Sequence, residues 1–149
     1  MANQYVVFQL EDELYGVNIH QVRGVEKLLP LTRVPNAPSF LKGVCNLRGS
    51  VIPVIDLKER LSLPYQEEVK NAKIIIVNVG KHTVGMTIDT AADVVSIDSQ
   101  EIEPSPSLVG GIDAEFIQGV AKVRDRLLIL LNLERILTVD QIQALDSLD

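Results

Sequence analysis

Only a few side chains in this sequence have the type and spacing that chemistry would need. His20 and His82 are the only histidines and Cys45 is the only cysteine, and no His or Cys neighbours them at metal-ligand spacing. Gly110-Gly111 lacks the Lys-Ser/Thr ending of a phosphate-binding loop. Asp and Glu are plentiful, but they fall mostly in expected turns, caps and loops, where solvated charge is normal. The sequence therefore predicts no catalytic residue, no metal site, no cofactor and no enzymatic activity.

One short motif is more informative, because its chemistry is that of recognition. In Asn46-Leu47-Arg48-Gly49, an arginine at a strand end stands beside a glycine and can turn its planar guanidinium outward. Arginine is enriched at interfaces, which favours a binding role for Arg48. A solvated turn arginine fits the same spacing equally well. Later in the chain the corresponding segment, residues 122–125, reads Lys-Val-Arg-Asp and has lost both the Asn and the Gly.

The composition excludes several classes of protein. The 149 residues carry 14 Lys and Arg against 20 Asp and Glu, which gives a net charge of −6 and a pI near 4.9. An acidic surface repels phosphate backbones, so nucleic-acid binding is not expected. The N-terminus does not resemble a signal peptide, and no stretch approaches the roughly 18 to 20 apolar residues of a membrane span. A single cysteine fits a reducing compartment, and we expect a cytoplasmic protein without membrane insertion.

The segments that must position these residues occur as an internal repeat in the sequence. Residues 40–57 return without a gap as residues 116–133, a shift of 76, and residues 5–16 return as residues 74–85, a shift of 69. Such self-similarity indicates one small unit used twice. Each copy is near the lower size limit for an independent core. Residues 1–149 are therefore expected to form a single domain with approximate repeats.

The repeats are placed at residues 5–67 and 73–137. Short runs rich in Val and Ile, separated by turn residues, predict five strands in each copy. They are expected at residues 5–10, 14–19, 25–28, 43–47 and 51–55, and again at 74–79, 83–88, 94–97, 119–123 and 127–131. Closure of five short strands removes exposed strand edges. The predicted fold class is mainly β, with two pseudo-symmetric five-stranded SH3-like β-barrels, short helices and a C-terminal helix.

Two features of the strands carry specific expectations. Pro53 cannot donate to a β-ladder, so the strand at residues 51–55 should lie at a sheet edge or carry a bulge there. Cys45 matches Ala121 in the second copy, which favours a small buried apolar residue over a reactive thiol. Two arrangements are open: each barrel closes from one contiguous half, or the two halves exchange strands.

Each copy is expected to end in a short helix. Asp56 and Asn132 are good N-cap residues at matching places, and Glu59 would complete a capping box with Asp56. A further helix is expected at residues 138–149, where Ile142, Leu145 and Leu148 form one apolar stripe. This stripe would pack on its own domain, and a helix that binds a partner is the alternative.

The sequence also resembles a known family. Residues 40–57, Phe-Leu-Lys-Gly-Val-Cys-Asn-Leu-Arg-Gly-Ser-Val-Ile-Pro-Val-Ile-Asp-Leu, are similar to the signature of the CheW-like family of bacterial chemotaxis coupling proteins. Residues 15–25, 32–36, 93–97 and 126–133 fit the pattern as well. The resemblance implies two SH3-like barrels, no catalytic activity, and an adaptor that joins transmembrane chemoreceptors to the histidine kinase CheA. Such an adaptor is cytoplasmic and is recruited to membrane receptor arrays.

The resemblance also implies two partner surfaces. The partners would be the cytosolic tip of methyl-accepting chemoreceptors and the regulatory domain of CheA. The receptor-facing groove would include Val22, Gly43, Asn46, Arg48 and Gly49. This sequence departs from many relatives by having Gly24 where they have Glu, so Glu26 is expected to take over any polar contact there.

The kinase-facing residues follow less directly from the resemblance. Val94, Val95 and Ile97 are the candidates, and core packing is the competing role for at least half of them. A related surface-motility or other chemosensory pathway would use a similar scaffold and is the alternative function. A module of this fold that has acquired a small-molecule site is a further alternative.

Overall fold

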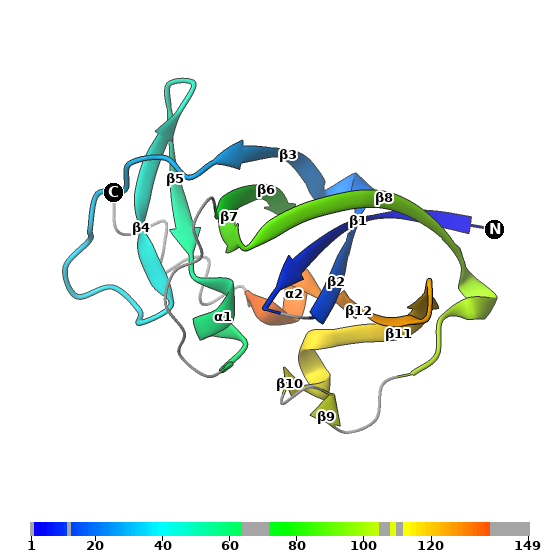
Figure 1. Cartoon of the computed structure of the whole chain (residues 1–149). Coiled ribbons are helices and arrows are strands. Elements are labelled where there is room, and N and C mark those ends of the chain that lie inside the picture. The colour runs from blue at the N-terminus through cyan, green and yellow to red at the C-terminus, as the bar shows by residue number, and fades with distance from the viewer. Residues whose placement is uncertain (1, 12, 64–71, 105–107, 110–111, 138–149) are drawn as a thin grey trace.

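All ten strands expected from the sequence are present in the computed structural model, which describes residues 2–11, 13–63, 72–104, 108–109 and 112–137. The fold is mainly β, as predicted (Figure 1). The strands are β1 (Ala2–Leu10), β2 (Glu13–Asn18), β3 (Val22–Lys27), β4 (Leu41–Leu47), β5 (Ser50–Ile55), β6 (Lys73–Val79), β7 (His82–Ile88), β8 (Thr90–Asp98), β9 (Leu108–Val109), β10 (Ile112–Asp113), β11 (Ile117–Val123) and β12 (Arg126–Leu131). The helical turns are η1 (Ile19–Gln21), α1 (Leu57–Arg60), η2 (Ser99–Glu101), η3 (Ala114–Phe116) and α2 (Leu133–Ile136).

The two halves of the chain exchange strands. One five-stranded sheet has the order β11-β12-β2-β1-β8, and the other has the order β3-β6-β7-β5-β4. We call them the β1 barrel and the β3 barrel. The first hairpin of each repeat, β1-β2 or β6-β7, therefore completes the barrel that is otherwise built by the other repeat (Figure 1). Neither barrel is contiguous in the sequence.

A matched pair of backbone bridges closes the two barrels. Thr32, which follows β3, exchanges hydrogen bonds of 2.8 and 2.9 Å with Val44 of β4. Glu103, which follows β8, exchanges two hydrogen bonds of 2.8 Å with Val120 of β11. A glycine precedes each bridge because the strands approach closely: a Cβ at Gly43 would lie 2.7 Å from the Thr32 carbonyl oxygen, and the equivalent distance at Gly119 is 3.0 Å. The glycines shared by the two copies thus serve the fold.

Hydrophobic residues at matched positions fill the two barrels. Cys45, Ile52, Val54, Ile74 and Ile76 form a cluster in the β3 barrel. Their counterparts cluster in the β1 barrel: Ala121, Leu128, Leu130, Tyr5 and Val7. The prediction that Cys45 is a small buried apolar residue equivalent to Ala121 is confirmed, since their exposed fractions are 3% and 4%.

A third cluster joins the two barrels to each other. It contains Phe8 and Tyr15 from the β1 barrel together with Ile75 and Met86 from the β3 barrel. Hydrophobic burial therefore stabilises the contact between the barrels as well as each barrel, and the exchange of strands requires the two to form together.

Arg60 of α1 contacts three residues of this third cluster. Its guanidinium carbon is 5.6 Å from the ring centroid of Phe40 and 4.7 Å from that of Phe116, the matching residue of the second copy. Its Nε donates a 2.6 Å hydrogen bond to the carbonyl oxygen of Ile136, which is the residue equivalent to Arg60 itself. Cation–π contacts of this kind stabilise a partly desolvated cation. One arginine thus contacts both halves of the repeat.

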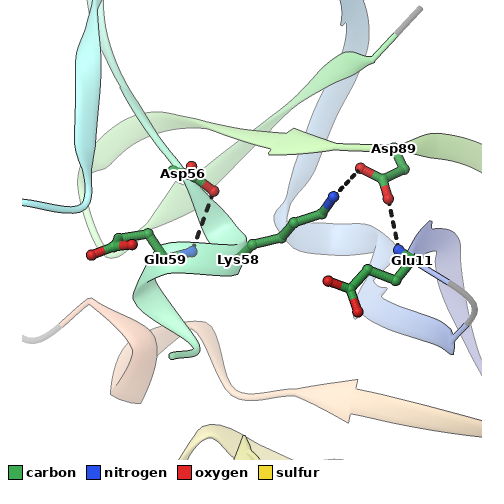
Figure 2. Close-up of polar contacts among 5 residues, drawn as sticks. All are labelled: Glu11, Asp56, Lys58, Glu59 and Asp89. Carbon is green, nitrogen blue, oxygen red and sulfur yellow. Dashed lines mark hydrogen bonds and ion pairs between the residues drawn. The ribbon is translucent and has the colours of Figure 1, made fainter. Parts of the chain in front are cut away.

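A second polar link crosses the contact between the barrels. Lys58 Nζ lies 2.8 Å from Asp89 Oδ1, and the side-chain exposures are only 16% and 10% (Figure 2). The other carboxylate oxygen of Asp89 accepts a 2.6 Å hydrogen bond from the backbone N–H of Glu11 (Figure 2). Asp89 lies where the chain leaves β7 of the β3 barrel and enters β8 of the β1 barrel. The ion pair therefore connects α1 to a crossover between the barrels.

The two helix caps differ although their positions match. Asp56 Oδ1 accepts a 3.3 Å hydrogen bond from the backbone N–H of Glu59 at the start of α1, which confirms the predicted N-cap (Figure 2). The predicted capping box with Glu59 is wrong, because the Asp56 N–H donates to the carbonyl oxygen of Phe40 at 2.7 Å instead. Asn132 occupies the N-cap position of α2 but makes no side-chain capping hydrogen bond. The expected C-terminal helix at residues 138–149 lies outside the described residues.

The strand that contains Pro53, β5, is a central strand, so the prediction that it lies at a sheet edge is wrong. The strand has β4 on one side and β7 on the other. However, the parallel pairing of β5 with β7 includes only Val54 with Gly85 and Ile55 with Met86. Pro53 lies just before this paired stretch, and the nearby bulge is in β4, between Leu41 and Gly43. The proline is tolerated because β5 is locally open on its β7 side.

Candidate functional site

The β4–β5 hairpin carries the motif singled out in the sequence and projects from the body of the molecule (Figure 1). Leu47 pairs with Ser50, so Arg48 and Gly49 form a two-residue turn. Both have positive φ, 52° and 88°, as a type I′ hairpin turn requires. The side-chain Oδ1 of Asn46 accepts a 2.9 Å hydrogen bond from the Gly49 N–H. Asn46 and Gly49 therefore hold the turn in shape, and Arg48 is displayed at its tip.

Arg48 is displayed with little restraint. Its Nη2 lies 3.2 Å from Glu26 Oε1, while 83% of the arginine side chain and 29% of the glutamate side chain are exposed. An exposed ion pair of this kind contributes only about 0 to 1 kcal/mol, because water screens both charges. A partner can therefore displace it at small cost. The acidic group beside this arginine is therefore that of Glu26, since Gly24 has no side chain to supply one.

A groove of about 520 Å³ opens beside the hairpin in the β3 barrel. We call it the Pro53 groove. Its apolar lining includes Val44, Ile52, Ile76 and Val84, and its polar rim is mostly basic. The rim residues with ionisable side chains are Arg23, Glu26, Arg48, Lys81 and His82. A basic rim stands out in a chain of net charge −6, and it favours an acidic partner.

The remaining predicted receptor residues lie deeper than the hairpin tip. Val22 is half-buried at the start of β3, where it packs against the cluster between the barrels. Gly43 is buried beneath Thr32, so its contribution is to let the backbone close. The structure thus brings Asn46, Arg48 and Gly49 together at one tip, whereas Val22 is half-buried and Gly43 is buried elsewhere in the β3 barrel.

The second copy has the same turn with different chemistry. Arg124 and Asp125 have φ values of 50° and 64° and form the two-residue turn between β11 and β12. In this turn Asp125 stands where Gly49 stands in the first copy, and it has a left-handed backbone conformation, which Asp tolerates better than most residues. The adjacent groove of about 370 Å³ has a rim with three acidic residues and two basic ones: Glu101, Glu103, Lys122, Asp125 and Arg126. The two grooves therefore present different charge to a partner.

The predicted kinase residues differ in accessibility. Val94 is 50% exposed on β8, Val95 is half-buried against the interior cluster of the β1 barrel, and Ile97 is 3% exposed within that cluster. The alternation follows from the strand, since successive side chains point to opposite faces. Of the three, Val94 alone is exposed, with half of its surface accessible to solvent.

Sequence reasoning missed a repeat-related pattern of exposed apolar residues. Val25 and Val94 match at a shift of 69, and Val51 and Leu127 match at a shift of 76. Their exposed fractions are 37%, 50%, 60% and 50%. Each barrel thus exposes apolar residues at the same two positions. The signal was present in the repeat alignment, but burial was needed to see that these apolar residues lie outside the core.

The described residues show no group of three or more His, Cys, Asp or Glu side chains placed to hold a metal ion. Within the same ranges, no helix is long and apolar enough to cross a membrane. Burial raises the pKa of the Cys45 thiol above its ordinary value. Burial also raises the pKa of Tyr15, with a further contribution from Glu13, whose Oε2 accepts a 3.2 Å hydrogen bond from the tyrosine hydroxyl. Both groups are therefore neutral at physiological pH.

Comparisons with known proteins identify the family. Residues 4–141 match the model of the CheW-like domain. The chain is 35% identical over 143 residues to the chemotaxis protein CheW of Bacillus subtilis, which covers 96% of this chain and 92% of the relative. It is 31% identical over 147 residues to the chemotaxis protein CheW of Klebsiella aerogenes, with coverages of 99% and 89%.

A solved structure agrees with the sequence matches. The crystal structure of the scaffolding protein TtCheW from Thermoanaerobacter tengcongensis superposes with a TM-score of 0.85 at 38% identity, covering 95% of this chain and 91% of that one. The predicted SH3-like double barrel is thereby confirmed. That relative is a scaffold, in agreement with the expectation of a non-enzymatic protein. The chain belongs to the CheW-like domain family.

Proposed function

We propose that the protein is a chemotaxis adaptor that couples chemoreceptors to the histidine kinase CheA. The relatives are chemotaxis proteins, and the similar solved structure is a scaffolding protein. In this role the protein is cytoplasmic and is recruited to membrane receptor arrays by its partners. It acts by holding two proteins together, which requires two separate surfaces on one rigid body.

The observation that carries the receptor surface is the shape of the β4–β5 tip. Asn46 and Gly49 lock the turn, and Arg48 extends from it with its side chain 83% exposed. A rigid turn reduces the entropy lost on binding, and an exposed guanidinium can form two parallel hydrogen bonds to a carboxylate. We therefore assign the cytosolic tip of methyl-accepting chemoreceptors to this end of the β3 barrel. Gly43 would act by letting β4 close against Thr32, and Val22 would act from the start of β3, where it packs against the cluster between the barrels.

The kinase surface is assigned to the β1 barrel. Val94 is exposed on β8, and Leu127 is exposed at the start of β12. Apolar residues that remain accessible on a folded barrel favour contact with another protein. The regulatory domain of CheA is the proposed partner, with Val94 and Val95 at the contact. Ile97 packs inside the barrel and would act by holding β8 in position.

The two assignments are tested by charge reversal at matched positions. Arg48→Glu should weaken binding to the receptor tip by about 2 kcal/mol or more, as expected when an interface arginine acquires the opposite charge. The fold should persist, because substitutions at exposed turns usually change stability by within about 0.5 kcal/mol. Arg124→Glu, at the equivalent turn of the β1 barrel, is the matched control and should weaken receptor binding less. Titration calorimetry with purified receptor tip measures both, and circular dichroism checks the fold.

The complementary substitution is Val94→Asp, which should weaken binding to the CheA regulatory domain and leave receptor binding unchanged. Arg48→Glu should change kinase binding little. The adaptor proposal fails if both substitutions weaken the same partner, because the two surfaces would then not be separate. It also fails if the purified protein binds neither partner.

A further inference from the structure

The Pro53 groove exists because two neighbouring strands separate. β5 and β7 pair in parallel only at Val54–Gly85 and Ile55–Met86. Before those pairs, Ile52 and Pro53 of β5 have partners on β4 alone, and Thr83 and Val84 of β7 have partners on β6 alone. The segments Ser50–Pro53 and His82–Val84 line the groove from opposite sides.

The β1 barrel shows that this separation is specific to one copy. There the equivalent parallel pairing between β12 and β2 includes Leu128 with Leu14 and Ile129 with Tyr15, as well as Leu130 with Gly16. Leu128 and Ile129 are the counterparts of Ile52 and Pro53 at the shift of 76. Proline has no N–H to donate to a ladder, whereas isoleucine does. The proline therefore accounts for the two pairs that the β3 barrel lacks.

Strand edges that line a groove offer backbone hydrogen bonds to an incoming chain. A volume of about 520 Å³ lies within the range of ligand pockets, roughly 300 to 1,000 Å³, and suits a short peptide. β5 and β7 run parallel to each other, so one extended segment running antiparallel to both can pair with either edge. Addition of a peptide strand to an exposed edge is a recurring mode of recognition.

The side chains around the groove specify the peptide. In an extended strand, alternate residues point to opposite faces. One face would meet the accessible apolar side chains of Val44, Leu47 and Val51, and the other would meet the charged rim. The rim has Arg23, Arg48 and Lys81 against the single carboxylate of Glu26. We propose that the Pro53 groove binds an extended acidic peptide segment, with alternating apolar and acidic residues, by strand addition to β5 and β7.

This site goes beyond the proposed adaptor function, because it binds an extended chain inside the groove and not a helical tip on the hairpin. The two surfaces share Arg48, which lines the groove and also forms the hairpin tip. A peptide in the groove would therefore compete for the arginine proposed to contact the receptor. The experiment must separate the two ligands.

The probe is the acetylated and amidated peptide Glu-Val-Glu-Val-Glu, titrated into the isotopically labelled full chain and followed by NMR. Alternate residues of a strand donate to the same edge, and the Ile52 N–H is already used in the pair with Cys45 on β4. Binding by strand addition should therefore slow hydrogen exchange at the amide of residue 51 on β5 and at one of the amides 83 and 84 on β7, because it protects them in new hydrogen bonds. The peptide Lys-Val-Lys-Val-Lys is the charge control and should bind at least about tenfold more weakly. A version of the acidic peptide with Pro in place of both Val residues is the backbone control, since it cannot donate from those positions.

Pro53→Ile introduces the residue found at the matched position of the β1 barrel. It should extend the β5–β7 pairing and reduce peptide affinity by about tenfold or more, because the edges are then already paired. Lys81→Glu, in an exposed turn, tests the rim without altering the strand and should weaken the acidic peptide while improving the basic one.

Two results would overturn strand addition: equal affinity for the acidic and basic peptides, or binding without slower exchange at the groove amides. Unchanged acidic-peptide affinity in both Pro53→Ile and Lys81→Glu would also overturn it. Receptor binding is measured on the same samples. If the protein binds the receptor but not the acidic peptide, the groove proposal is wrong and the adaptor function is unaffected. If it binds the acidic peptide but not the receptor, the adaptor function alone is contradicted.

Discussion

The ion pair between Lys58 and Asp89 makes a strong prediction about stability. The two side chains are 16% and 10% exposed and their charged atoms lie 2.8 Å apart, so neither ion is well hydrated. Asp89 also accepts the 2.6 Å hydrogen bond from the Glu11 N–H. Removal of one partner from a buried pair leaves an uncompensated charge, at a cost of about 3 to 5 kcal/mol when burial is complete. We expect about 2 to 4 kcal/mol here, because some solvent reaches both groups.

The substitutions are Lys58→Met, which keeps the aliphatic volume and removes the charge, and Asp89→Asn, which keeps a hydrogen-bond acceptor for Glu11. Each should lower the free energy of unfolding by about 2 to 4 kcal/mol, measured by urea denaturation. The double variant should be less destabilised than the sum of the two, with a coupling energy of about 1 to 3 kcal/mol.

A matched control is available in the second copy. Gln21 Nε2 donates a 2.9 Å hydrogen bond to Glu134 Oε1, which occupies the position equivalent to Lys58. This contact is exposed, so Gln21→Ala should cost within about 0.5 kcal/mol. The reasoning is refuted if Lys58→Met costs no more than Gln21→Ala, or if the double variant is simply additive. Burial of the pair would then not determine its energetic effect.

Three further outcomes follow from the fold. Residues 1–67 and 68–149, expressed separately, should be largely unfolded, because each barrel needs a hairpin from the other half. A sharp, independent unfolding transition of either half, measured by calorimetry, would contradict this. Gly85→Ala should destabilise the protein by about 1 to 3 kcal/mol, since the new Cβ would lie 2.8 Å from the Ile74 side chain. Gly24→Ala should have little effect in the same denaturation assay, because no atom of the described residues lies within 4 Å of its new Cβ. Cys45 should resist alkylation at neutral pH until the protein unfolds, because burial raises its pKa and excludes reagent; rapid labelling of the folded protein, detected by mass spectrometry, would count against this.

Local patterns in the sequence predicted much of the fold and part of the site. Strand positions follow from Val- and Ile-rich runs with turn residues between them, and both are properties of short segments. The turn at Arg48 and Gly49 was indicated locally as well, because a glycine separates two strand-forming runs there. The equivalence of Cys45 with Ala121 followed from the repeat, because matched positions of a duplicated unit have similar surroundings.

The status of individual strand residues required the structure. Val94, Val95 and Ile97 are similar in sequence, yet one is half-exposed and one is buried, and the difference depends on which face of β8 meets the barrel interior. Pro53 predicted an edge strand or a bulge at its own position, but the strand is central, the bulge is in β4, and the opening lies between β5 and β7. Neighbouring strands are separated by many residues in the chain, so no local pattern names them.

By itself the sequence determined that the chain contains one unit twice, where its strands and turns lie, and which family it resembles. The tertiary structure alone decided that the two copies exchange hairpins, because β1-β2 and β6-β7 are similar enough in pattern to suit either barrel. Which barrel each hairpin joins depends on long-range packing, including the cluster between the barrels and the Lys58–Asp89 ion pair at a crossover. Such contacts are made between distant parts of the chain, and their energies exist only once the fold has formed.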